Sequence, residues 1–280
     1  MVNSNSDRAI LLKMVLFVQS ESILQIGCAF IAFAPSAVFT YTILSERSQL
    51  IIIALASAFL WLCSILVSAS IWTLVPSSVQ SSWPFVTTVG VLIQEIFRCL
   101  LIKLIFKVEG FIKTHIPPST AEAAVPLNDI TNALAAGVGF GTMHAVITYG
   151  SVLAENGGPG TLFVDSCPFC PLVLFSAFLA LTFVILDVLL VVMMLSGLKQ
   201  MNPSRILSVV FIHLVASYVT IFDAMPNGCL ASGVLLVVIL FWAGIMTRRI
   251  VIQEKMFLPD GEKQAQQQVL QNFQEKSVRI

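Results

Sequence analysis

The chain has 280 residues, of which 57% are hydrophobic and only 11% are charged, and its mean hydropathy is +0.93. A soluble domain carries roughly 25% charged residues because its surface faces water. This composition therefore excludes a soluble enzyme, a nucleic-acid-binding protein and a disordered chain, although the net charge is zero. Most of the chain must lie in lipid.

Seven apolar stretches are long enough to cross a bilayer as helices, which takes about 20 residues each. They lack the alternation of barrel strands, so helices are the form in which they can span. No charged residue lies between Arg47 and Glu95, and this stretch must cross twice, with a turn near Pro76. We therefore predict an all-α, polytopic membrane protein with seven transmembrane helices. The predicted spans are residues 22–44, 50–75, 85–106, 130–154, 172–198, 206–222 and 230–252.

Two further segments flank the predicted membrane domain of residues 22–252. Residues 1–21 contain an apolar run from Ile10 to Val18 that is too short to span, and they lack a small-x-small cleavage site of a signal peptide. We interpret them as an N-terminal extension, either a short interfacial helix or a disordered segment. Residues 253–280 are rich in glutamine and charge, and we predict a mobile or weakly helical cytoplasmic tail.

The Lys and Arg residues are distributed unevenly between the two sides of this arrangement. The loops after the first, third and fifth spans, the end of the third span and the C-terminal tail hold 12 of them, whereas the other side holds only Arg8 and Lys13. Cytoplasmic loops carry an excess of Lys and Arg. We therefore predict a luminal or extracellular N-terminus and a cytoplasmic C-terminus, and six or eight spans would scramble this charge pattern.

Polar side chains in the third predicted span need partners, because polar groups at membrane depth are costly. Gln94 precedes Glu95 there, and Glu95 and Arg98 are three positions apart on one helical face, where they can pair. Two interpretations remain open. One is an ion pair near the cytoplasmic interface with Arg98 snorkelling, and the other is a contact to a partner helix.

The fourth predicted span carries small residues at every fourth position, namely Gly137, Gly141 and Ala145, with the polar His144 beside them. Such a ridge lets another helix backbone approach closely. It can serve internal packing against the chain's own helices or assembly with another protein.

Asp187 in the fifth span and His213 in the sixth are the other candidate intramembrane polar residues. If these spans are neighbours, the two side chains can hydrogen-bond directly or through one water, and we expect this pair in the bundle interior. We interpret it as structural, with a proton relay or a catalytic site as the alternatives.

The six cysteines predict neither a metal site nor redox chemistry. Cys28, Cys63 and Cys99 lie within spans and act as small apolar fillers. Cys167 and Cys170 lie in a predicted luminal loop and can form a strained disulfide. No second cysteine pair or histidine lies near them to complete a zinc site, so we expect no metal and no cofactor.

Several motifs occur in an order that is similar to one known family. They are IGCAFIAFAP at 26–35, QEIFR at 94–98, GVGFG at 137–141, GPG at 158–160, SAFL at 176–179, and His213. Over about residues 22–252 the chain resembles the anterior-pharynx-defective (Aph) family, a subunit of γ-secretase, with the same seven spans and an outer N-terminus.

The resemblance implies a non-catalytic scaffold, needed for assembly and stability of an intramembrane aspartyl protease complex that cleaves type I membrane proteins, as in Notch signalling. The implied partners are a nicastrin-like subunit, a presenilin-like catalytic subunit, a presenilin-enhancer-like subunit and the lipid bilayer. The implied locations are the endoplasmic reticulum, the Golgi and the plasma membrane.

The resemblance also implies roles for individual residues. Gly137, Gly141 and the third step, Ala145, are expected to support assembly, although the family usually has glycine at the third step. The family places a histidine in each of the fifth and sixth spans. His213 matches the second, whereas Asp187 stands where the first is expected.

Three other classes of protein fit the sequence less well. An intramembrane aspartyl protease would use Asp187 and Asp223 as a carboxylate dyad, but the sequence lacks the Gly-x-Gly-Asp and Pro-Ala-Leu segments, and Asp223 lies at the luminal end of its span. A multi-span transporter would need duplicated halves or broken helices, and no internal repeat is found. A seven-helix receptor would carry Asp-Arg-Tyr after the third span and Asn-Pro-x-x-Tyr in the seventh, and both are missing.

Overall fold

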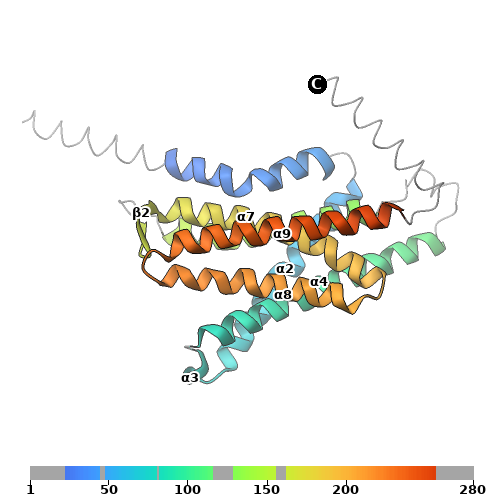
Figure 1. The fold of residues 1–280 in the computed structure, drawn as a ribbon. Helices are drawn as coiled ribbons and strands as arrows, with labels where there is room; N and C mark the ends of the chain where they lie inside the picture. Colours follow the sequence, from blue (N-terminus) through green and yellow to red (C-terminus); the bar gives the residue numbers. More distant parts are fainter. Residues whose placement is uncertain (1–22, 45–47, 81, 116–128, 156–161, 257–280) are drawn as a thin grey trace, which may run out of the picture.

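The computed structural model describes residues 23–44, 48–80, 82–115, 129–155 and 162–256. The predicted extension of residues 1–21 and most of the predicted tail of residues 253–280 lie outside this part of the chain. Within it, the seven predicted apolar stretches correspond to seven separate long helices, although the sixth stretch continues past α8 into a short 3-10 helix (Figure 1).

The first apolar stretch forms the helix of residues 23–39, which continues into the π-helical segment η1 (Thr40–Leu44). The other long helices are α2 (Ser48–Leu74), α4 (Trp83–His115), α6 (Asp129–Glu155), α7 (Leu172–Lys199), α8 (Pro203–Val219) and α9 (Gly228–Met256). The all-α polytopic fold agrees with the prediction. Six of these helices are long and apolar enough to cross a membrane, whereas α4, with Glu95 and Arg98 in its middle, is not among the six.

Helix α7 lies at the centre of the bundle, where it packs against α4, α6, α8 and α9 (Figure 1). Its 28 residues contain only two charged side chains, Asp187 and Lys199. A helix that is hydrophobic on all sides is buried in protein or lipid. Because lipid tails are as apolar as leucine, close packing and interhelical polar contacts, rather than a hydrophobic drive, hold such helices together.

A tight turn makes α7 and α8 antiparallel neighbours. Met201 adopts a positive φ of 50°, and Asn202 then caps α8, whose first residue is Pro203. The Asn202 side chain accepts hydrogen bonds from the backbone N–H groups of Ser204 and Arg205 at 3.1 and 3.4 Å. Proline at the first position and an asparagine cap are both favourable helix starts, so this turn fixes how the middles of α7 and α8 face each other.

A small hairpin closes the opposite end of the bundle. Strands β1 (Phe163–Val164) and β2 (Cys167–Pro171) pair antiparallel directly before α7. A disulfide joins Cys167 to Cys229 in the first turn of α9, and the backbone N–H of Asn227 donates to the carbonyl oxygen of Ser166 at 2.7 Å. These contacts hold the start of α9 against the start of α7.

The Cys167–Cys170 disulfide that the sequence left open does not form, because Cys170 is a free thiol and Cys167 pairs with Cys229. The two neighbouring cysteines lie in the extended strand β2. Three residues of extended chain span about 10 Å, whereas disulfide-bonded residues have Cα atoms within about 7 Å. The Cα atoms of Cys167 and Cys229 are 6.1 Å apart.

Candidate functional site: a buried polar cluster

Five ionisable side chains meet inside the bundle and come from the middles of four helices. We call them the polar cluster. They are Glu95 and Arg98 of α4, His144 of α6, Asp187 of α7 and His213 of α8. All five are buried, and the Arg98 side chain is 0% exposed.

Hydrogen bonds link the polar cluster into one chain. Arg98 Nη1 donates to Glu95 Oε1 at 2.5 Å, and Arg98 Nη2 donates to Asp187 Oδ1. His144 Nδ1 lies 2.8 Å from Asp187 Oδ2, and His213 Nδ1 lies 2.5 Å from Glu95 Oε1. Arg98 is therefore the central member, with a carboxylate on each side and an imidazole beyond each carboxylate.

Aromatic rings enclose the α6 side of the polar cluster. His144 stacks on Trp61 with ring centroids 5.1 Å apart, and the Phe183 ring also lies 5.1 Å from it. The Arg98 guanidinium lies over the Phe140 ring, 4.8 Å from its centroid, in a cation–π contact. These rings keep solvent and lipid away, which strengthens the electrostatic interactions inside.

The charges of the polar cluster nearly balance. Two carboxylates and one guanidinium leave one net negative charge, which protonation of either imidazole cancels. The carboxylates of Glu95 and Asp187 are separated by Arg98 and do not form the adjacent, proton-sharing dyad of an aspartic protease. Asp223 lies in η2 (Thr220–Ala224), ten residues beyond His213, and accepts a hydrogen bond from Ser232. The geometry therefore supports a structural cluster rather than a catalytic one.

Two expectations for these residues are corrected. Asp187 and His213 make no direct hydrogen bond to each other, because Asp187 contacts Arg98 and His144 whereas His213 contacts Glu95. Arg98 does not snorkel to an interface, since it is fully buried and reaches another helix of the same chain. Gln94 is buried next to Glu95, but within the described part of the chain it makes no hydrogen bond to the polar cluster.

The small-residue ridge of α6 packs against α7. A Cβ atom added at Gly137 would lie 2.7 Å from Val188 Cα, and one at Gly141 would lie 2.9 Å from the Val184 carbonyl oxygen. Ala145 is buried in the same interface, in a cluster that includes Val184. The ridge therefore packs against a helix of the same chain. Its close approach is what brings His144 within reach of Asp187.

Sequence reasoning missed three contacts of this site, namely Gly139 with α2, His144 with Asp187 and Arg98 with Asp187. Gly139, on another face of α6, faces α2 so closely that an added Cβ atom would overlap the Ala54 carbonyl oxygen. His144 follows Gly141 by three positions, so helical periodicity already places it on the ridge face toward α7. Arg98 is the one basic residue well inside a predicted span, and an acid in a neighbouring span is its natural partner.

Among the residues that the structure describes, no three His, Cys, Asp or Glu side chains gather in a way that could hold a metal ion.

The comparisons with known proteins point to a family of membrane subunits. A sequence profile of the Aph-1 protein family matches residues 23–254. The chain belongs to the Aph-1 family.

Relatives from animals and plants support this assignment. The gamma-secretase subunit APH-1B of Homo sapiens is 32% identical over 229 residues, which are 78% of this chain and 86% of that protein. The gamma-secretase subunit APH1-like of Arabidopsis thaliana is 30% identical over 207 residues, 73% of this chain and 83% of the relative. The gamma-secretase subunit Aph-1 of Drosophila melanogaster is 31% identical over 199 residues, 71% and 80% of the two chains.

The part of this Aph-1 chain that matches the family contains the whole polar cluster and the ridge. The resemblance predicted a histidine in the fifth span, where the chain has Asp187. The structure supplies an imidazole at this place from the neighbouring helix, because His144 of α6 lies against the Asp187 carboxylate. An imidazole therefore still meets α7 in this Aph-1 protein, although it comes from α6.

Proposed function

We propose that the chain is a non-catalytic scaffold subunit of a γ-secretase-like intramembrane protease complex. Membership of the Aph-1 family and relatives named as gamma-secretase subunits support this function. The single observation that carries it is the arrangement of Glu95, Arg98 and Asp187, in which both carboxylates are engaged by one guanidinium between helices. Such a cluster holds helices in register and leaves no carboxylate dyad for peptide-bond hydrolysis.

The proposed partners are a presenilin-like catalytic subunit, a nicastrin-like subunit and a presenilin-enhancer-like subunit. The complex would cleave type I membrane proteins, and the chain would contribute to its assembly and stability. A scaffold needs a rigid surface, and the interlocked helices α4, α6 and α7 supply one. The proposed locations are the endoplasmic reticulum, the Golgi and the plasma membrane.

The proposed orientation has seven spans, including α4, with the N-terminus luminal and the C-terminus cytoplasmic. Besides the Lys and Arg distribution, the two ends of the bundle differ in chemistry. One end carries the ion pair of Lys199 with Asp129 and the hydrogen bond from Arg205 to Gln253. The other end carries the Cys167–Cys229 disulfide, and disulfides persist in oxidising compartments such as the lumen.

Co-purification in mild detergent tests this function. We expect the tagged chain to recover the presenilin-like, nicastrin-like and enhancer-like subunits together, with protease activity only when all are present. Asp223→Asn keeps an acceptor for Ser232 and is expected to leave this activity unchanged. Proteolytic activity from the chain purified alone, lost on Asp223→Asn, would reverse the conclusion and establish a protease.

A further inference from the structure

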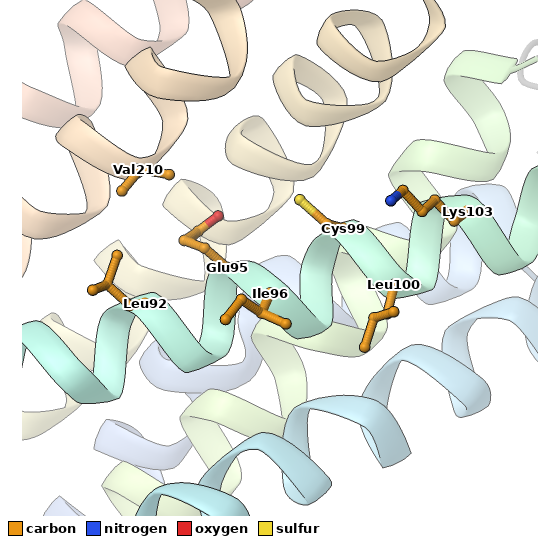
Figure 2. A pocket seen from close by; sticks show the side chains of 7 residues that line it. All are labelled: Leu92, Glu95, Ile96, Cys99, Leu100, Lys103 and Val210. Carbon is orange, nitrogen blue, oxygen red and sulfur yellow. The ribbon is translucent and has the colours of Figure 1, made fainter. Parts of the chain in front are cut away.

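A groove runs along the outer face of α4, beside the polar cluster but open to the outside of the bundle (Figure 2). We call it the α4 groove, and its volume is about 350 Å³. Leu92, Ile96 and Leu100 follow one another at four-residue intervals and form one side of it. The other lining residues are Glu95, Cys99, Lys103 and, from α8, Val210.

Glu95 lines this groove, and one of its carboxylate oxygens is buried without a partner. Glu95 Oε1 accepts from both Arg98 and His213, whereas Glu95 Oε2 is buried and makes no hydrogen bond. In Figure 2 the Glu95 carboxylate lies between the side chains of Val210 and Cys99. An unpaired carboxylate oxygen in a low-dielectric setting costs free energy. A ligand in the groove that donates a hydrogen bond to this oxygen would remove that cost.

The depth of Glu95 decides what kind of ligand can supply that donor. Glu95 lies ten residues from one end of the predicted span 85–106, which corresponds to about 15 Å along a helix. The hydrocarbon core is about 30 Å thick, so Glu95 lies near its middle. Lipid headgroups lie at the surfaces, and acyl chains carry no donor. A side chain of another transmembrane helix can deliver a hydroxyl or amide at this depth.

We propose that the α4 groove binds a transmembrane helix of another subunit, and that a Ser, Thr, Asn or Gln side chain of this helix donates a hydrogen bond to Glu95 Oε2. This inference rests on the proposed function, which supplies the other subunits. The row of Leu92, Ile96 and Leu100 fits an elongated apolar partner, and polar side chains between membrane helices are typical of such contacts. The unpaired oxygen of Glu95, beside the row of Leu92, Ile96 and Leu100, would set the register of the partner helix.

A photocrosslinking experiment on the assembled complex identifies the occupant. A benzophenone amino acid replaces Leu100, whose side chain is on the rim of the groove, and the crosslinked product is analysed by mass spectrometry. We expect a peptide from a transmembrane segment with a Ser, Thr, Asn or Gln at the level of Glu95. Adducts to lipid alone, in a complex that still contains all subunits, would overturn the proposal and leave the scaffold function intact.

A steric test uses two positions with matched exposure on the same helix. Leu100→Trp fills the groove, whereas Leu104→Trp adds the same bulk outside its lining; the two leucines are 49% and 47% exposed. We expect Leu100→Trp alone to lower recovery of the crosslinked subunit. Equal recovery with both variants would contradict an occupied groove.

A double-mutant cycle tests the hydrogen bond itself. In Glu95→Gln the remaining oxygen can still accept from Arg98 and His213, but an amide donor replaces Oε2 and faces the partner's donor. We expect roughly three- to tenfold less co-purified partner, the range for one interhelical hydrogen bond. Replacing the partner's donor residue with alanine should lower co-purification only slightly further in the Glu95→Gln background. This non-additivity is expected even where Glu95→Gln also destabilises the chain itself. Additive losses would overturn the hydrogen bond. If the wild-type chain recovers no other subunit at all, the proposed function fails as well.

Discussion

Arg98 of α4 and Asp187 of α7 form an ion pair inside the bundle in which neither side chain is more than 1% exposed. The pair joins the helix that carries Glu95 and Arg98 to the central apolar helix. Breaking a buried pair by removing one partner leaves the other charge without compensation. The stability of the helix arrangement therefore depends on both residues together.

Single substitutions of this pair should be severe. We expect Arg98→Leu or Asp187→Leu to lower the free energy of unfolding by about 3–5 kcal/mol, measured by thermal unfolding in detergent. The double variant should lose less than the sum, because no uncompensated charge remains between the two positions. Lys199→Gln, in the half-exposed ion pair with Asp129, serves as the control and should cost at most about 1 kcal/mol. Strictly additive losses for Arg98 and Asp187 would show that the pair is not coupled.

Exchange of the acid and the imidazole between α6 and α7 gives a second prediction. Asp187→His would introduce the histidine that the resemblance places in the fifth span. In this structure the new imidazole would face both Arg98 and His144 and deprive Arg98 of one of its two carboxylates. We expect Asp187→His to reduce complex yield strongly, and His144→Asp combined with Asp187→His to recover part of it. Yield is measured by co-purification of the other subunits. A wild-type yield of the complex with the Asp187→His single variant would contradict this account.

Much of the fold was accessible from the sequence, because hydrophobic length alone defines membrane helices. All seven apolar stretches correspond to separate long helices. The residues of the polar cluster were also found, since charges in an apolar run are conspicuous. Of their contacts, the pair of Glu95 with Arg98 within one helix was expected, but the contacts between helices were not, because a span sequence gives the face of a helix but not which helix that face meets. Asp187 pairs with Arg98, 89 positions away, and only the packing of α4 on α7 brings them together.

The cysteine pairing also depends on tertiary contacts that the sequence alone does not show. The sequence left a bond between Cys167 and the nearby Cys170 open, whereas the partner of Cys167 is 62 positions away. The extended backbone of β2 excludes the nearby pair, and the position of α9 selects Cys229. The two-residue strand β1 and the sharp turn before α9 determine this geometry. The Pro226-Asn227-Gly228 run marks a turn in the sequence, but the two-residue strand has no pattern that is visible in a single sequence.

Gly139 and Gly137 lie on different faces of α6, against α2 and α7, and give a third prediction. Gly139→Ala places a methyl group against the Ala54 carbonyl oxygen of α2, and Gly137→Ala places one 2.7 Å from the Val188 backbone of α7. Backbone atoms cannot move aside as a flexible side chain can, so each change should cost about 1–3 kcal/mol, as other overpacked sites do. Gly150→Ala in the same helix meets nothing within 4 Å and serves as the control. Thermal unfolding in detergent measures all three, and unchanged stability of Gly139→Ala would contradict the close contact of α6 with α2.

The disulfide between the hairpin and α9 gives a fourth prediction. Cys167→Ser or Cys229→Ser should lower the free energy of unfolding by about 2–4 kcal/mol, the usual range for a lost disulfide, because the start of α9 is no longer tied to β2. A reducing agent should destabilise the wild-type chain in the same way and leave either variant unchanged. Cys170→Ser keeps the disulfide and is the matched control. Equal unfolding temperatures with and without reductant in the wild-type chain would contradict a stabilising bond.

The same cysteines report the orientation of the chain in the membrane. Treatment of sealed microsomes with a maleimide that cannot cross membranes should leave Cys167, Cys170 and Cys229 unlabelled, because the hairpin end is proposed to be luminal. After permeabilisation without reductant, Cys170 is the free thiol of these three. Burial raises the pKa of its thiol, so little reactive thiolate exists at neutral pH, and labelling should be slow at pH 7 and faster as the pH rises. Reduction should then expose the other two thiols to the reagent. Labelling of this end in sealed, right-side-out microsomes would reverse the orientation, because only a cytoplasmic hairpin is accessible to the reagent there.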